Sequence, residues 1–323
     1  MMKLPLIKNS VLMLATAFVF SGCVIAESET TSRTIPGEFT DGIFFATPTM
    51  ANGQQVRFYT DTGGGFNAIK RSVASQIEPA TLGHDSETIE WPIFQTGMGI
   101  PSNPVFRDGQ LQVVDDSQLG HRQDGFLGGR WFANRIWEFD YPRSQLLLHE
   151  SLPPYIDETW SSVPLGFQVD EKGQRTMHFA RLPIDIDGIV VQVLFDTGAR
   201  IEITEESSRT FGRQVGQWIG GSFMCAEVFD LLRSEHPEWR YIERGDLVSG
   251  KEFAMIEVEE IMIAGISAGP VWFARRPDYA FKSYMTQFMD QEICGAIGGS
   301  GLRYFRSIID YSDETLWLQQ ISP

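Results

Sequence analysis

Two aspartates stand in the same short motif at distant points of this sequence. Asp61 and Asp196 each begin an Asp-Thr-Gly triplet, at 61–63 and at 196–198. A carboxylate held in an apolar setting is costly to ionise unless it has hydrogen-bond donors or shares a proton with another acid. Each aspartate is therefore a candidate partner for the other, and the pair predicts general acid–base chemistry.

The segments before the two motifs predict strands. Residues 189–195 are almost all apolar, rich in β-branched side chains and free of Pro and Gly, which is typical of a buried strand. Residues 56–60 lead into Asp61 in the same way, and Asn-Gly at 52–53 and Asp-Gly at 187–188 predict hairpin turns ahead of the two strands. The aspartates are thus expected where buried strands end.

A second pair of patterns indicates an internal duplication. Phe-Leu-Gly-Gly at 126–129 has its first glycine 12 residues before Asp140, and Ala-Ile-Gly-Gly at 296–299 has its first glycine 12 residues before Asp310. Each of these aspartates is followed by Tyr, and by leucines 6 and 8 residues later. The second half holds 35 more residues between its two patterns, since 298 − 196 is 102 and 128 − 61 is 67.

Two Asp-Thr-Gly motifs, each followed by a hydrophobic-hydrophobic-Gly motif, resemble those of the aspartic peptidases, the family of pepsins and retroviral-type proteases. The resemblance extends from about Ile35 to the C-terminus, and its motifs are closer to the retroviral type. It implies an all-β fold: two similar β-barrel lobes at 37–150 and 165–323, a linker at 151–164, a cleft between the lobes and a few short helices.

The resemblance also implies an aspartic endopeptidase, with Asp61 and Asp196 as its catalytic pair. Close carboxylates share one proton, for which aspartic proteases are the standard example. The ionised aspartate would activate a water, and the protonated one would polarise the carbonyl and deliver a proton, with no cofactor or metal. Supporting roles fall to Thr62 and Thr197, which brace the loops, and to the close-packed glycines Gly63, Gly198, Gly128 and Gly298.

A flap over the cleft is expected in the first half, at residues 91–104. Trp91, Phe94, Gly97 and Gly99 would contact the substrate there, and the alternative is a plain surface loop. Helices are predicted at 128–134, 227–235 and 279–289, and the second of these is assigned to the 35 extra residues.

One departure from many pepsins bears on pH. The residue after each Asp-Thr-Gly is Gly64 or Ala199, where many pepsins carry a hydroxyl that stabilises the ionised aspartate. The dyad pKa should then be less depressed than in pepsins, and the optimum should be mildly acidic to near neutral.

The N-terminus has the form of a bacterial secretory signal. Residues 1–22 contain two lysines and a short apolar stretch, followed by Cys23. Small residues before this cysteine resemble a lipoprotein cleavage site, which would lipidate Cys23 and place the protein in the periplasm or at the cell surface, on the outer membrane by family habit. An ordinary secretory peptide and an uncleaved anchor remain alternatives. Residues 23–36 are polar and predict a tether.

The charge and the cysteines restrict the classes of binding partner and the state of the second half. The net charge of −16 disfavours nucleic acid and is explained by solubility or by a preference for cationic substrates. Cys225 and Cys294 form either a disulfide or two buried thiols.

One aspartate per half predicts an active monomer whose partner is a peptide or protein substrate. The rival interpretation is an inactive peptide-binding or scaffold lipoprotein that keeps the fold.

Overall fold

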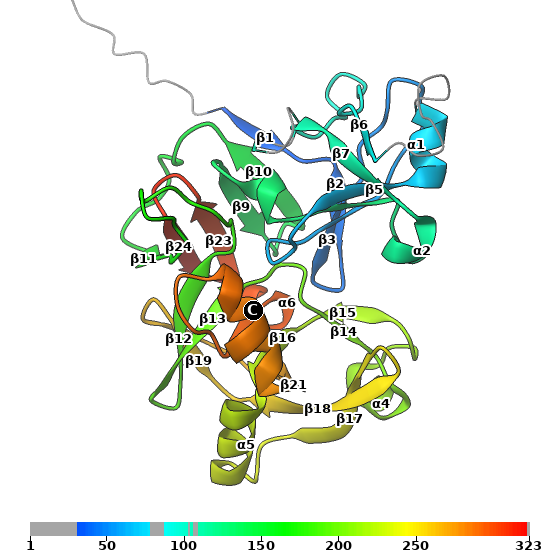
Figure 1. Cartoon of the computed structure of the whole chain (residues 1–323). Helices are drawn as coiled ribbons and strands as arrows, with labels where there is room; N and C mark the ends of the chain where they lie inside the picture. Colours follow the sequence, from blue (N-terminus) through cyan, green and yellow to red (C-terminus); the bar gives the residue numbers. More distant parts are fainter. Residues whose placement is uncertain (1–30, 78–86, 103, 106–108, 322–323) are drawn as a thin grey trace, which may run out of the picture.

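The strands of the protein form four sheets joined by short helices (Figure 1). The computed structural model describes residues 31–77, 87–102, 104–105 and 109–321. The expected all-β class is confirmed. Within these ranges no helix combines the length and the apolar character that a membrane crossing requires.

The first half of the chain builds a seven-stranded sheet in the order β2-β3-β4-β8-β5-β7-β6. Every residue of β3, β4, β5 and β8 is buried, so both faces of the sheet are covered there. The strands are β2 (Gly37–Thr40), β3 (Ile43–Ala46), β4 (Phe58–Thr60), β5 (Asn67–Lys70), β6 (Thr88–Ile89), β7 (Leu111–Val114) and β8 (Gly125–Leu127), with helices α1 (Arg71–Ile77) and α2 (Asp116–Leu119).

The second half builds a nine-stranded sheet in the order β17-β18-β21-β16-β22-β13-β12-β19-β20. Asp187 and Gly188 both have positive φ and close the β12–β13 hairpin, as predicted. The strands are β12 (Arg181–Ile186), β13 (Ile189–Phe195), β16 (Ser222–Cys225), β17 (Tyr241–Val248), β18 (Lys251–Val258), β19 (Ile261–Ile263), β20 (Ile266–Ala268), β21 (Val271–Arg276) and β22 (Gly295–Ile297).

The other elements of the second half lie between these strands. A separate two-stranded sheet joins β14 (Arg200–Glu202) to β15 (Trp218–Gly220), with helix α4 (Glu205–Phe211) between them. Helix α5 (Ala226–Glu235) confirms the helix predicted at 227–235. The helix predicted at 279–289 is a π-helix, η2 (Tyr279–Tyr284), followed by a 3-10 helix, η3 (Met285–Phe288).

Four strands of each large sheet share one order and one set of directions. In β4-β8-β5-β7 and in β13-β22-β16-β21, the first pair is parallel, the second antiparallel and the third parallel. The third strand is followed by a helix in both sets, α1 after β5 and α5 after β16. Helix α5 therefore matches α1, and its assignment to the extra residues was wrong.

The extra residues of the second half lie elsewhere. Strand β16 starts 26 residues after Asp196, whereas β5 starts 6 residues after Asp61, so 20 of the 35 residues lie directly behind the second aspartate. They form the β14–α4–β15 segment, called the insertion below. The starts of β21 and β22 are 24 residues apart, whereas the starts of β7 and β8 are 14 residues apart. Ten more of the extra residues therefore lie between β21 and β22, in the part of the chain that contains η2 and η3.

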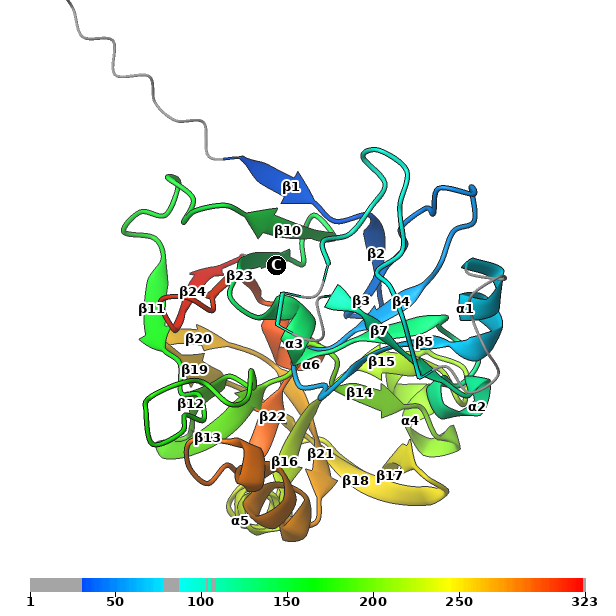
Figure 2. The same ribbon diagram turned by 45° about the horizontal axis from the view of Figure 1, so that its top comes forward.

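The two halves meet in a six-stranded sheet of order β1-β10-β9-β23-β24-β11 (Figure 2). Strands β9 and β23 pair antiparallel at its centre, with Glu138 opposite Ile308. The strands are β1 (Ser32–Thr34), β9 (Ile136–Asp140), β10 (Gln145–His149), β11 (Ser161–Pro164), β23 (Phe305–Asp310) and β24 (Thr315–Gln320). Helices α3 (Gly129–Phe132), predicted within 128–134, and α6 (Gly299–Leu302) precede β9 and β23.

The shared sheet corrects three expectations. Strand β1 lies inside the expected tether at 23–36, and β11 lies inside the expected linker at 151–164. The closed β-barrels are not formed, because each sheet keeps two edge strands within the described ranges. The last two strands of each half form a hairpin, and the two hairpins join through β9 and β23 instead of closing a barrel within each half.

A buried charged group joins the two halves at the shared sheet. The fully buried carboxylate of Glu138 on β9 accepts hydrogen bonds from Arg306 on β23 and from Tyr155, and lies 2.7 Å from His149 Nε2. Burial raises the pKa of Glu138, but the bonds with His149, Tyr155 and Arg306 outweigh it and hold this pKa below its ordinary value. Removing one partner of such a buried pair costs about 3–5 kcal/mol.

Candidate active site

The two Asp-Thr-Gly loops have matching backbone geometry. Asp61 follows β4 and its amide donates to the Leu127 carbonyl of β8, while Asp196 follows β13 and donates to the Ile297 carbonyl of β22, both at 2.9 Å. The amide three residues after each aspartate donates back to the aspartate's carbonyl at 3.1 Å. Both loops are therefore tight turns fixed by a neighbouring strand.

The two threonines connect the loops. Thr62 Oγ1 donates to the Phe195 carbonyl at 2.7 Å and accepts from the Thr197 amide at 2.9 Å. Thr197 Oγ1 accepts from the Thr62 amide at 3.3 Å. Because both threonines are buried, these bonds are shielded from competing water and hold the aspartates in one arrangement.

The glycines of each loop face the aspartate of the other. A Cβ on Gly63 would lie 2.8 Å from Asp196 Cγ, and a Cβ on Gly198 would lie 2.3 Å from Asp61 Cγ. Since real Cβ atoms keep at least about 3 Å from such neighbours, only glycine allows this approach. The loops that carry Asp61 and Asp196, 135 positions apart, are thus in direct contact.

Gly128 and Gly298 lie against the loops. A Cβ on Gly128 would be 2.5 Å from the Gly64 carbonyl oxygen, and one on Gly298 would be 2.6 Å from the Asp196 carbonyl oxygen. Their amides are held by side chains that the sequence did not single out, Asn67 Oδ1 at 2.7 Å and Ser222 Oγ at 3.0 Å. Asn67 is the first residue of β5 and Ser222 is the first residue of β16, which are the corresponding strands of the two halves.

The two carboxyl groups are not equivalent. Burial, and then the charge of Asp61, raises the pKa of Asp196 well above its ordinary value. Burial also raises the pKa of Asp61, but hydrogen bonds from Asp196 and from the Gly63 amide and the charge of Arg200 oppose it. The pair therefore holds a proton on Asp196 and ionises first at Asp61. Asp196 Oδ1 is buried and has no hydrogen-bond partner among the described residues.

A cavity of about 360 Å³ opens at the dyad. Asp61 is its only described lining residue from the first half of the chain. The second half supplies Asp196, the β14 side chains Arg200 and Glu202, Arg276 of β21 and the tip of the β17–β18 hairpin at 247–249, together with Gly198, Ala199 and Phe223. The site is therefore asymmetric beyond its two aspartates.

The flap expected in the first half does not line this cavity. Of its four residues, Trp91 and Phe94 pack against the hydrophobic core. Gly97 forms a turn at φ 77°, and a Cβ on Gly99 would meet Phe94 at 2.8 Å. The Thr49 amide and carbonyl bind this loop at 3.0 and 2.9 Å, so the loop is held against its own half. The alternative of a surface loop describes it better.

The hairpin at the cavity belongs to the second half. Strands β17 and β18 are joined through Ser249 and Gly250, whose φ values of 50° and 79° fit a type I′ turn. A Ser-Gly pair between two eight-residue runs is a turn pattern that sequence reasoning could have used. It was missed because the flap was sought only in the first half.

The insertion supplies two cavity-lining residues that sequence reasoning missed. Arg200 and Glu202 lie on β14, directly behind the Asp196 motif. Tyr59, from β4 of the first half, donates a hydrogen bond to the Gly198 carbonyl and so fixes the second loop from the other side. Nothing in the local pattern distinguishes Arg200 from a surface arginine until the fold places it at the cavity.

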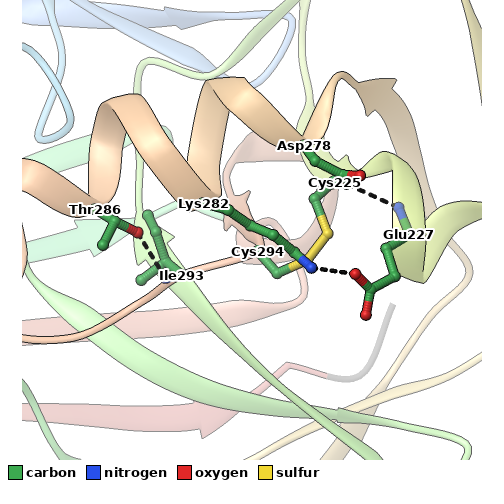
Figure 3. The surroundings of a disulfide bond; sticks show 7 residues. All are labelled: Cys225, Glu227, Asp278, Lys282, Thr286, Ile293 and Cys294. Atoms are coloured by element: carbon green, nitrogen blue, oxygen red, sulfur yellow. Dashed lines mark hydrogen bonds and ion pairs between the residues drawn. A yellow bond between two sulfur atoms is a disulfide. The ribbon is translucent and has the colours of Figure 1, made fainter.

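The cysteines of the second half are joined. Cys225 and Cys294 form a disulfide with Cα atoms 5.0 Å apart, which decides between the two alternatives for them (Figure 3). Beside it, Lys282 of η2 pairs with Glu227 of α5, and Asp278 accepts from the Glu227 amide at 2.9 Å. The disulfide therefore ties the end of β16 to the start of β22.

Residues 1–22 and Cys23, expected as the signal and the lipidation site, lie outside the described residues.

No protein-family model matches the chain, and no curated protein matches it.

Proposed function

We propose that this protein is an aspartic endopeptidase with two similar lobes, each of which supplies one catalytic aspartate. The observation that carries the proposal is the meeting of two Asp-Thr-Gly loops through reciprocal threonine bonds and glycine contacts. The shared strand order of the two large sheets supports an origin by internal duplication. A single chain holds both aspartates, so we propose an active monomer.

The chemistry follows from the asymmetry of the dyad. Ionised Asp61 takes a proton from a water, whose oxygen adds to the peptide carbonyl carbon, while Asp196 donates its proton to the carbonyl oxygen. The resulting tetrahedral diol collapses when the C–N bond breaks. The leaving nitrogen takes the proton from Asp61, and Asp196 recovers its own from the diol hydroxyl.

The β17–β18 hairpin is the proposed flap of this enzyme. Its tip lines the dyad cavity and reaches it from a two-residue turn, so a substrate would lie between the tip and the aspartates. For the N-terminus we keep the proposal made from sequence: a lipid on Cys23 anchors the protein to a bacterial membrane, facing the periplasm or the cell surface.

Cleavage of a broad peptide library tests the activity. The wild-type protein should cut peptides internally, and Asp61→Asn and Asp196→Asn should each reduce the rate by roughly 10⁴-fold, since each removes the general base or the general acid. Asp187→Asn, in the exposed β12–β13 turn, is the matched control and should cut like the wild type. Cleavage that survives either dyad substitution contradicts the proposal, and peptide binding without cleavage favours the scaffold alternative.

A further inference from the structure

The insertion is fixed against the first half of the protein. The Gly220 amide donates to the Asp41 carbonyl at 2.6 Å, Arg213 forms an ion pair with the Asp41 carboxylate at 2.7 Å, and Arg122 donates to the Gly216 carbonyl. Both ribbon views show β14 and β15 beside the seven-stranded sheet (Figures 1 and 2). A segment held from both halves is a rigid support for side chains at the dyad.

Arg200 occupies this support at the cavity. Its guanidinium carbon lies 3.9 Å from the centre of the Trp218 ring and 5.6 Å from that of Tyr59. The side chain is exposed and lines the same cavity as Asp61. Stacking on Trp218 restricts the guanidinium before any ligand arrives, which lowers the entropy lost on binding.

The two arginines of the cavity differ in their partners. Arg276 is paired with the buried carboxylate of Asp246, so its charge is neutralised within the fold. No carboxylate lies within 4.0 Å of Arg200 in the described ranges. Glu202, two residues away, instead accepts from the indole of Trp218 at 3.2 Å.

A guanidinium of this kind is suited to a carboxylate. Arginine presents a planar fork of donors that matches two carboxylate oxygens. Asp61 and Glu202 line the same cavity, and their negative charges disfavour a free acidic ligand that does not reach the guanidinium itself. We propose that Arg200 binds an acidic side chain, Asp or Glu, of the peptide in this cavity and so determines sequence preference. The inference rests on the proposed peptide site, although it does not require turnover.

Capture of peptides on a variant that retains them tests this proposal. Asp196→Asn protein is immobilised and incubated with a random peptide library, and the bound fraction is sequenced by mass spectrometry. We expect Asp and Glu to be enriched at one position of the bound peptides. In an individual Glu/Gln peptide pair, the Glu form should bind about tenfold more tightly, as for one charge-assisted hydrogen-bonded pair.

Matched variants separate the role of Arg200 from general charge. Adding Arg200→Met should abolish the acidic enrichment, and Arg200→Lys should retain part of it. Arg209→Met removes an exposed charge from α4 of the same insertion, away from the cavity, and should leave the enrichment unchanged. Absence of acidic enrichment, or enrichment that survives Arg200→Met, would overturn the proposal.

Cleavage assays on the wild-type background keep the two proposals apart. Acidic enrichment without any cleavage would contradict the proposed endopeptidase activity and support the role of Arg200. Cleavage without acidic preference would support the endopeptidase activity and contradict the role of Arg200. In a cleaving enzyme, Arg200→Met should also move the acid limb of kcat/KM to higher pH, because the Arg200 charge lowers the pKa of Asp61. This shift follows from the Arg200 charge alone, so the difference between the Glu and Gln peptides, which a structural role would not produce, remains the test of binding.

Discussion

The two halves of the molecule agree at the aspartates and differ around them. Each half places its aspartate between the same strands, with the same backbone bonds and a glycine against the opposite carboxyl group. Among the described residues, only the second half adds an insertion behind its loop and sends a hairpin to the cavity. The comparison teaches that the contact between the loops is symmetric, whereas the lining of the cavity comes mainly from the half that reaches it.

Apart from replacement of the aspartates themselves, the largest expected effect comes from filling the space between the loops. Gly198→Ala should lower kcat/KM by about 10²-fold or more, since a Cβ 2.3 Å from Asp61 Cγ must displace that carboxyl group. Gly63→Ala, at 2.8 Å from Asp196 Cγ, should have a smaller effect. Gly65→Ala is the control, because its Cβ would meet only Phe179 at 3.8 Å. Steady-state kinetics measures all three, and an active Gly198→Ala enzyme would contradict the geometry.

The threonines test how equal the loops are. Thr62→Val removes an oxygen with two hydrogen bonds and leaves the Phe195 carbonyl and the Thr197 amide unpaired, which should lower the free energy of unfolding by about 2–3 kcal/mol. Thr197→Val removes one longer bond of 3.3 Å and should cost less than about 1 kcal/mol. Urea unfolding gives both values. Equal losses would show that the bracing is symmetric after all.

The hairpin tip and the first-half loop form a third contrast. Val248→Asp should lower kcat/KM by about tenfold, mainly through KM, because it removes an apolar contact and adds a charge beside the ionised dyad. Ile93→Asp, at a more exposed position on the loop first expected to be the flap, should leave kcat/KM unchanged. Thermal unfolding should be the same for both. A larger effect at Ile93 would restore the first-half flap.

The dyad pKa values predict a pH-dependent gain in stability. The folded state holds a proton on Asp196 at pH values where the unfolded chain has lost it, so stability falls as pH rises from the ordinary aspartate pKa to the raised one. Asp196→Asn removes that loss and should raise Tm at neutral pH by a few degrees, at about 2–4 °C per kcal/mol, but not near pH 4. Asp61→Asn should gain less. Calorimetry at both pH values checks the sign.

The smallest effect concerns Ala199, the residue after the second motif. Ala199→Ser restores a hydroxyl beside Asp196, which should lower the dyad pKa and move the pH optimum down by less than about one unit. Gly64→Ser should instead lose activity at every pH, because its Cβ would lie 2.5 Å from the Phe126 ring. An Ala199→Ser optimum that stays in place would remove the sequence-based explanation of the pH range.

Local patterns in the sequence predicted a large part of the fold. The strands that end at Asp61 and Asp196, the turn at 187–188 and the helices at α3 and α5 were all expected, because each depends on neighbouring residues. The π-helix at η2 and the strand pairing of the tether depend on contacts with distant segments, and local periodicity carries no information about those.

The described residues of the loop at 91–104 do not line the dyad cavity, for a related reason. Trp91 and Phe94 have the composition of a substrate-contacting loop, but aromatic rings gain the same free energy by packing on their own core. The cavity is lined instead by Leu247 and Val248 at the end of the β17–β18 hairpin, because the hairpin extends beyond the core and its side chains are free to face the cavity. Composition alone does not distinguish these outcomes.

By itself the sequence determined that two Asp-Thr-Gly motifs lie at the ends of buried strands in two similar halves, since motif spacing and apolar periodicity are properties of the chain. The tertiary structure decided which carboxyl group keeps the proton, which arginine at the cavity is paired with a carboxylate and which half supplies most of the cavity lining. Those outcomes depend on burial and charge contributed by Tyr59, Asp246 and other residues far away in the sequence. Electrostatic energies of this kind are set by distance in space, and the chain acquires those distances only when it folds.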